Sequence, residues 1–199
     1  MDSRLKRMLD KNEKVIYQGK PDKKCFIFEG IFNPSMPFAL LWGFMDFFFI
    51  NAMFSPENSV SGENGFYLLT ALLFMIHLFP FWVYLGGVLF VLNKYKNAYY
   101  VVTDKAVYLS KGIFSKHYST TPYTEISNVE LHRGFFDKKL DVGDVVLTTD
   151  RIEKDSSGRR CYAKVSISDI AYYNDVYKIV KMLQEQLYVG GVPREMYEK

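Results

Sequence analysis

The sequence predicts a membrane protein of mixed class, in which a two-helix transmembrane hairpin precedes a mainly β domain, a small barrel or sandwich with a C-terminal helix. Two long apolar segments, 36–54 and 66–92, are separated by a short polar loop at 55–65. Residues 36–92 contain no Lys or Arg, and beyond residue 97 the pattern changes to short alternating runs. We therefore divide the chain into an N-terminal segment, 1–35, the hairpin, 36–92, and a C-terminal domain, 93–199.

Both apolar segments have the length and composition of membrane spans. The first has fifteen apolar residues out of nineteen and is about 28 Å long as a helix, close to the ~30 Å hydrocarbon core. The second has twenty-two out of twenty-seven and would measure roughly 40 Å, which requires tilt, a kink at Pro80 or extension beyond the membrane. The alternative is a buried hairpin in a soluble protein, but soluble core helices usually keep a polar face.

The distribution of basic residues predicts the orientation of the hairpin. The loop 55–65 has two Glu and no Lys or Arg, whereas basic residues flank the outer ends of the spans at Lys20, Lys23, Lys24, Lys94 and Lys96. Basic flanks are retained on the cytoplasmic side of a membrane. We expect a multi-pass protein of the plasma membrane with both termini cytoplasmic. A signal peptide is not expected, because the first apolar run begins only at residue 36.

Two polar residues interrupt the spans at comparable depths. Asp46 lies about 12 Å along its helix from Phe54, and His77 about 16 Å from Phe66, so the two side chains can meet in an antiparallel hairpin. A charged Asp at the bilayer centre costs about 2.5–3.5 kcal/mol, so it should face protein, share a proton or be neutral. The pair is either a proton-linked or substrate-linked site, or a structural contact between helices or between copies of the chain. Two helices make too little wall for a pathway, which favours the structural interpretation.

The remainder of the chain alternates with the period of β-strands. Runs rich in β-branched and aromatic residues predict six or seven strands, at 98–102, 106–109, 113–123, 126–132, 142–149 and 162–167. An amphipathic helix should follow at about 174–189, with Val176, Val180 and Leu183 on one stripe. Near the other terminus, residues 2–11 suggest a short amphipathic helix on the membrane surface or, equally, a solvated chain end.

At these residues the chain resembles the bacterial pleckstrin-homology-like (PH-like) membrane proteins. The matching stretches are YYVVTDKAVY (99–108), KGIF (111–114), PYTEISNVE (122–130), RGFFDKKL (133–140) and VGDV (142–145), together with EKVIYQGKP (13–21) before the hairpin. The chain departs from this pattern at Asp141, where a small or apolar residue, often Gly, is expected. The resemblance implies a helical hairpin joined to a PH-like barrel, and it implies function only weakly because such barrels bind lipids, peptides and proteins alike.

The sequence contains no catalytic pattern that supports an enzyme. No HExxH, GxSxG, GxxxxGK[ST] or GxGxxG motif occurs, and His77, His117 and His132 are scattered. The two cysteines, Cys25 and Cys161, have no paired spacing, and we expect two free thiols. We therefore predict a non-enzymatic protein with no cofactor and no metal site. The mild basic surplus does not indicate nucleic acid as a partner.

A binding role is the remaining prediction. Basic residues near glycine turns are the candidate binding surface, namely Lys105, Lys111, Lys116, Arg133, Lys138 and Lys139. Phe135-Phe136 before Lys138-Lys139 would make an apolar wedge beside two cations at a membrane surface, or both rings pack inside and the lysines are solvated.

These observations lead to a ranked set of functions. We predict a membrane-anchored PH-like scaffold at the cytoplasmic membrane face, whose partners are the lipid bilayer and a protein or a second copy. The alternatives are a small accessory subunit of a transport or export complex, in which Asp46 and His77 work inside the bilayer, and a module that binds the headgroups of anionic lipids.

Overall fold

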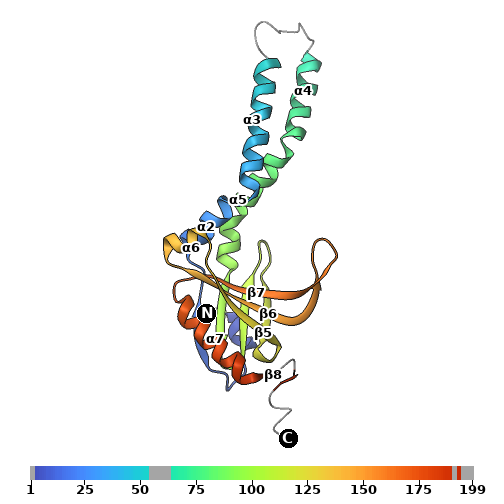
Figure 1. The fold of residues 1–199 in the computed structure, drawn as a ribbon. Helices are drawn as coiled ribbons and strands as arrows, with labels where there is room; N and C mark the ends of the chain where they lie inside the picture. Colours follow the sequence, from blue (N-terminus) through green and yellow to red (C-terminus); the bar gives the residue numbers. More distant parts are fainter. Residues whose placement is uncertain (1–2, 54–63, 190–191, 194–199) are drawn as a thin grey trace. The chain divides into compact units, whose positions relative to one another are not determined.

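The computed structural model describes residues 3–53, 64–189 and 192–193, and the chain divides into two compact units. One unit combines Met1–Phe28 with Leu92–Lys199 and contains the described strands, and the other, Glu29–Val91, is helical (Figure 1). Most of the predicted loop 55–65 lies outside the described residues.

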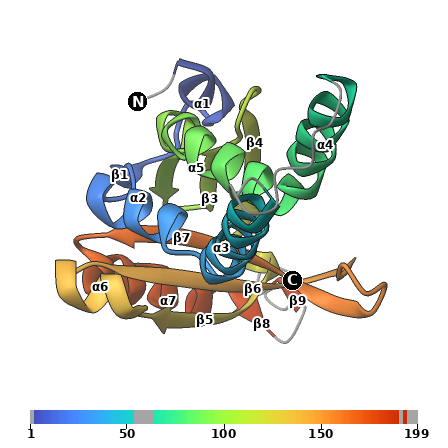
Figure 2. The same ribbon diagram turned by 90° about the horizontal axis from the view of Figure 1, so that it is seen from above.

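The β unit is built on two larger antiparallel sheets that lie in layers (Figure 2), with a third, two-stranded sheet near the C-terminus. The first has the order β1-β2-β3-β4, with the bounds Val15–Gly19, Tyr99–Thr103, Ala106–Lys111 and His117–Pro122. The second has the order β5-β6-β7, with the bounds Ile126–His132, Gly143–Lys154 and Arg160–Ile170. A 3-10 turn, η2 (Tyr123–Glu125), joins the sheets, and β8 (Tyr188–Val189) pairs with β9 (Val192–Pro193).

The alternation of side chains along the strands creates the core between the sheets. On β2, Tyr100 and Val102 point into this core, while Val101 points to the opposite face. Helix α7 (Tyr173–Leu187) contacts β5 and β6 and contributes Val176 and Val180, which are 0–1% exposed. Burying one such side chain stabilises the fold by about 1.5–3 kcal/mol. Two antiparallel sheets and a C-terminal helix confirm the predicted β domain.

The N-terminal segment, which we predicted to be separate from the β domain, supplies the first strand of the sheet. β1 pairs with β2 so that Gly19 lies opposite Tyr100 and Gln18 opposite Val101. The two strands are separated in sequence by the whole helical unit. A pairing over such a distance leaves no mark on the local pattern, because each strand by itself shows only an alternating run.

Helix α1 (Ser3–Met8) lies over the outer face of the same sheet (Figure 2). Leu5 is fully buried in a cluster with Val101, Ala106 and Tyr108. Without α1, these apolar side chains of β2 and β3 would face water, which is unfavourable. Both positions expected for this segment, on a membrane surface and as a solvated end, are therefore wrong.

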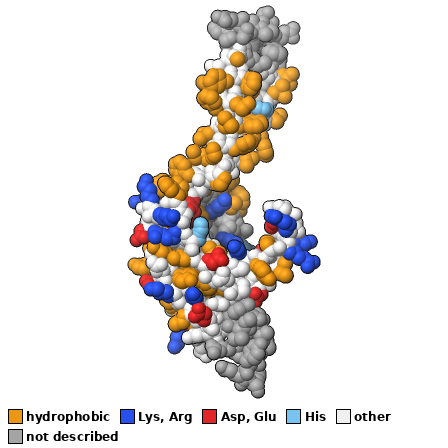
Figure 3. All heavy atoms as spheres, viewed as in Figure 1, with side chains coloured by type: hydrophobic (Ala, Val, Ile, Leu, Met, Phe, Trp, Pro, Cys, Tyr) orange, Lys and Arg blue, Asp and Glu red, His pale blue; other side chains and the backbone are white. Residues whose placement is uncertain are grey.

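The helical unit contains α3 (Ser35–Met53) and α4 (Asn64–His77), and α2 (Lys23–Ile31) and α5 (Phe79–Asn97) connect it to the β unit. α3 matches the predicted span 36–54 and is long and apolar enough to cross a membrane. Only 11% of its most apolar stretch is buried, and hydrophobic side chains cover α3 and α4 (Figure 3). A core helix of a soluble protein would be mostly buried, which the described part of α3 is not.

The second predicted span, 66–92, is two helices that meet at an angle of 56°. Pro80 explains the break, because it has no N–H to donate to the carbonyl of Ile76 and its ring crowds the preceding turn. Two indoles compensate for lost backbone bonds near the break: Trp42 Nε1 donates to the carbonyl of His77 (2.9 Å) and Trp82 Nε1 to that of Met75 (3.3 Å). The bend was one of the three predicted ways of fitting this long segment to a bilayer.

Candidate functional site

A cavity of about 650 Å³ lies within the β unit, lined by strands of both sheets. Its walls come from β2, β3 and β4 on one side and β7 on the other, with residues from α2 and the end of α5. The lining residues are Phe26, Lys94, Ala98, Tyr100, Leu109, Ser110, Lys111, Gly112, Ile113, His117, Ser119, Lys164, Val165, Ser166 and Ser168. This volume is in the range of pockets that bind small molecules.

The charges around the cavity have one sign. Lys94, Lys111 and Lys164 line it, and none of the lining residues that the structure describes is Asp or Glu. Within the described residues none of these three lysines forms an ion pair, in contrast to Lys105, which pairs with Asp10 (3.2 Å). Uncompensated cations around a concave surface raise the local concentration of anions.

Hydroxyl groups and apolar side chains complete the lining. Ser166 and Ser168 approach each other at 2.8 Å (Oγ to Oγ), and Ser110 Oγ donates to the carbonyl of Asn97 (2.9 Å). Burial raises the pKa of Tyr100 to about 12, so its hydroxyl stays protonated. The lysines and hydroxyls would bind an anionic group, and the apolar walls would contact an apolar part of the same ligand.

The β3–β4 loop at the edge of the cavity has a fixed backbone. Gly112 has a φ of 144°, and a Cβ atom there would collide with the carbonyl oxygen of Ser115. Asn97 Nδ2 donates to the carbonyls of Gly112 (3.2 Å) and Ile113 (3.4 Å). The end of α5 therefore holds the loop that follows Lys111.

The structure divides the predicted basic surface. Lys111 lines the cavity, whereas Lys116 lies in the following loop and is not part of the lining. Arg133 has a structural position: its Nε donates to the carbonyl of Val142 (3.0 Å), and its guanidinium lies 4.7 Å from the ring centre of Tyr173. The prediction thus identified one cavity lysine, and the structure adds Lys94, Lys164 and His117.

The remaining two predicted lysines lie on α6 (Phe135–Leu140), where basic side chains gather on the surface (Figure 3). Lys138 and Lys139 are exposed, and so is Phe135, at 77%. Phe136 is half-buried and packs on Phe28, with ring centres 5.8 Å apart. The two alternatives for this segment are therefore each half right, since one ring is outside and the other packs inside.

The turn after α6 explains the departure of the sequence at Asp141. Its φ of 53° is left-handed, a conformation that Gly adopts without strain, which accounts for the expectation of Gly at this position. Asp is among the few side chains that tolerate this conformation. Its carboxylate also accepts a bond from Arg133 Nη2 (3.1 Å).

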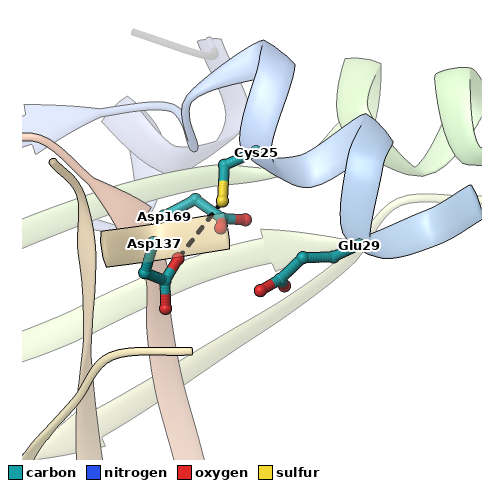
Figure 4. A group of neighbouring side chains, drawn as sticks. All are labelled: Cys25, Glu29, Asp137 and Asp169. Atoms are coloured by element: carbon teal, nitrogen blue, oxygen red, sulfur yellow. Dashed lines mark hydrogen bonds between the residues drawn. The ribbon is translucent and has the colours of Figure 1, made fainter. Parts of the chain in front are cut away.

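A buried thiol and two buried carboxylates meet where α2, α6 and β7 come together (Figure 4). Cys25 Sγ donates to Asp137 Oδ1 (3.2 Å), and Asp169 lies beside them; Glu29, also drawn, is one turn beyond Cys25 on α2. Burial, followed by the bonds to both carboxylates, raises the pKa of Cys25. A thiol that stays protonated is a hydrogen-bond donor here and not a nucleophile.

Inside the helical unit, Asp46 and His77 are in contact. The carboxylate Oδ1 lies 2.6 Å from His77 Nδ1, and the Asp46 side chain is only 1% exposed. The indole of Trp42 lies over the imidazole, with ring centres 5.0 Å apart. These contacts link α3 to α4 and were anticipated from the depths of the two residues in their spans.

Comparison with protein families identifies the fold. A family described as "Bacterial PH domain" matches residues 46–181. The chain belongs to this family. The match confirms the resemblance predicted from the sequence. No curated protein and no solved structure matches the chain.

The bacterial PH domain match begins within α3 and ends within α7. It includes the strands β2–β7 and every lining residue of the cavity except Phe26. It does not include α1 or β1, which the structure adds to the same sheet.

The residues that the sequence analysis missed carry a recognisable signal. On β7, Lys164, Ser166 and Ser168 alternate with Val165 and Ile167, so the polar residues share one face of the strand. Lys94 was interpreted only as a flank of the second span. That Lys94 and Lys164 meet at one cavity depends on the pairing of distant strands.

Proposed function

We propose that this bacterial PH domain protein is a membrane-anchored, non-enzymatic binding module that captures an anionic ligand in the cavity between its sheets, at the cytoplasmic face of the plasma membrane. The observation that carries the proposal is a set of three lysines that form no ion pair with any described residue, around a cavity whose described lining contains no Asp or Glu. Each charge-assisted hydrogen bond to an anion contributes about 1.5–3 kcal/mol.

Membrane anchoring is supported by the helical unit. α3 is one span by length and composition, and α4 with α5 would be a second, bent span. No Lys or Arg occurs between residues 36 and 92, whereas Lys94 and Lys96 follow the second apolar segment directly. This pattern supports a multi-pass hairpin with both termini cytoplasmic. It also positions Lys94, one of the cavity lysines, next to the end of a span in the sequence.

The non-enzymatic part of the proposal is supported by the chemistry of the cavity. Its described lining combines ammonium groups, hydroxyls, apolar walls and one imidazole, that of His117, and it includes no carboxylate to pair with that imidazole as a catalytic acid or base. The protonated Tyr100 is a donor to a bound ligand and not a base. A ligand that is part of the lipid bilayer, or an acidic segment of a protein partner, would meet the same groups.

The test compares two pairs of lysines in the full-length protein purified in mild detergent. The cavity variant is Lys111→Gln with Lys164→Gln, and the matched control is Lys138→Gln with Lys139→Gln, which removes the same charge from α6. The probes are dioctanoyl phosphatidic acid and inorganic phosphate, measured by calorimetry. The full chain is required because β1 belongs to the sheet.

The cavity variant should bind the lipid at least about ten-fold more weakly, and the α6 variant should bind as the wild type does. Binding of phosphate without the lipid would assign the site to a soluble anion. The proposal fails if neither probe binds the wild type, or if the α6 variant is the one that loses binding.

A second candidate function is a small accessory subunit of a transport or export complex. The observation in its favour is the 2.6 Å contact between Asp46 and His77, which joins two mainly apolar helices. The Asp46→Asn side chain can still form a hydrogen bond with His77 but cannot carry a charge or exchange a proton. Co-purified membrane proteins that disappear with this variant, while the protein itself still assembles, would favour this candidate over a scaffold.

A further inference from the structure

Two aromatic rings are exposed on the β unit where α2 packs on α6. Phe28 is 40% exposed and Phe135 is 77% exposed. Phe136 lies between them, with its ring centre 5.8 Å from that of Phe28 and 5.4 Å from that of Phe135. The bond from Cys25 Sγ to Asp137 Oδ1 (3.2 Å) fixes α6 against α2. Exposed apolar side chains that are held in this way are typical of a contact with another surface.

Exposed lysines accompany these rings on the same two helices. None of the four forms an ion pair with a described residue; they are Lys23 and Lys24 on α2 and Lys138 and Lys139 on α6. The acidic residues of the two helices are Glu29 and Asp137, and Asp137 is buried. Figure 3 shows Lys and Arg side chains beside hydrophobic ones in this region. We refer to the four lysines with Phe28 and Phe135 as the α2–α6 patch.

We propose that the α2–α6 patch docks on the anionic headgroup layer of the membrane that anchors the chain. The proposal goes beyond the ligand cavity and rests on the proposed membrane anchoring. Phe28 precedes Ser35, the first residue of α3, by only seven positions. Seven residues extend over at most about 25 Å. The chain itself therefore keeps the patch within that distance of the beginning of the proposed span.

Charge complementarity favours a lipid surface over a protein partner. The cytoplasmic leaflet carries anionic lipids, which attract lysines close to a span. A Phe ring inserts among the headgroups while neighbouring lysines keep their ammonium groups at the phosphates. Protein interfaces, in contrast, are depleted in Lys relative to the rest of the surface. Four lysines around two exposed rings therefore fit the membrane better.

The experiment places a polarity-sensitive NBD fluorophore on a single exposed cysteine of the full-length protein in lipid vesicles. Cys161 is replaced by Ser, and buried Cys25 is retained. Phe135→Cys reports on the patch, and Met182→Cys on α7, where Met182 is 50% exposed, is the matched control. The vesicles consist of phosphatidylcholine alone or mixed with phosphatidylglycerol, with or without a spin-labelled lipid that quenches nearby fluorophores.

In the anionic vesicles, the fluorophore at position 135 should shift to shorter wavelength and be quenched by the spin-labelled lipid, whereas that at position 182 should do neither. Adding Lys138→Gln with Lys139→Gln should shift the equilibrium from docked to free by roughly 30-fold. The same change at Lys178 and Lys181 on α7 should have no effect. Molar salt should also release the patch, because it screens the attraction.

Three results would overturn the proposal: equal quenching at both positions, quenching in pure phosphatidylcholine that the Lys138 and Lys139 substitutions leave unchanged, or a wavelength shift at position 135 without quenching. The last result would assign the patch to a protein surface. Alkaline carbonate extraction separates these failures from failure of the anchoring. Protein that resists extraction but is not quenched at position 135 refutes only the docking, whereas extracted protein refutes the anchor. Calorimetry with the short-chain lipid in detergent, where no bilayer is present, tests the cavity independently.

Discussion

Replacing Leu5 with Ala should destabilise the β unit, because this side chain is fully buried against Val101, Ala106 and Tyr108. Truncation of a buried Leu costs about 2–5 kcal/mol, with the low end at sites that can collapse. α1 has only six residues and lies on the outer face of the sheet, so we expect about 2 kcal/mol. At 1.4 kcal/mol per factor of ten, this raises the fraction of molecules in which the β unit is open by about 30-fold.

The thiol of Cys25 reports this change, because it is fully buried and reacts only when the β unit opens. With Cys161 replaced by Ser, the labelling rate of Cys25 in the full-length protein should rise about 30-fold in Leu5→Ala. Met8→Ala is the matched control on the same helix; Met8 is 40% exposed, and the rate should change by no more than about two-fold. Equal rates for wild type and Leu5→Ala would refute the reasoning, since α1 would then detach without opening the sheet.

Three further substitutions test other parts of the structure. Gly30→Ala should destabilise the helical unit by about 1–3 kcal/mol in thermal melts, because the new Cβ would lie 2.5 Å from Val91 Cγ2. Adding Val91→Ala removes this clash and should restore part of the lost stability, and no recovery would contradict the explanation. Gly112→Ala should weaken binding of phosphatidic acid, because the new Cβ would collide with the Ser115 carbonyl and displace the β3–β4 loop at the edge of the cavity. An unchanged affinity in calorimetry would mean that this loop does not shape the cavity. Burial raises the pKa of Asp144 above its ordinary 3.8, so the folded state binds this proton more tightly than the unfolded state does. The free energy of unfolding should therefore fall as the pH rises from 3.8 through the raised pKa. Asp144→Asn still accepts from the Asp169 N–H and should reduce this pH dependence in thermal melts from pH 4 to 7, and an unchanged pH dependence would exclude Asp144 as its source.

The structure also explains why an isolated C-terminal fragment is a poor test of function. Unit boundaries in space do not follow the predicted boundaries in sequence, because residues 1–28 pack with 92–199. A fragment that starts at residue 93 would lack β1 and α1, and it would expose the edge of β2 and the apolar face around Val101. Binding assays on such a fragment would measure the consequences of that exposure as well as the ligand site.

Several elements followed from local pattern alone. The apolar run that became α3 is identified by length and by the absence of basic residues. β5 has the predicted bounds, Ile126–His132, because the apolar Val129 and Leu131 alternate with polar residues at the period of a strand. The stripe of Val176, Val180 and Leu183 on α7 packs on the core as its period of 3.6 residues indicates. In each case neighbours in the sequence carry the information.

The cavity is formed by residues that are far apart in the sequence, so local patterns do not predict it. The sequence by itself determined the helical segments, most strands and the family, since these depend on periodicity and composition over a few residues. Only the tertiary structure decided that β1 completes the sheet, that Cys25 meets Asp137 across 112 positions, and that Lys94, Lys111 and Lys164 line one cavity. The physical reason is that strand pairing and packing join residues far apart in the chain, and a one-residue change of register would turn every side chain of a strand to the opposite face.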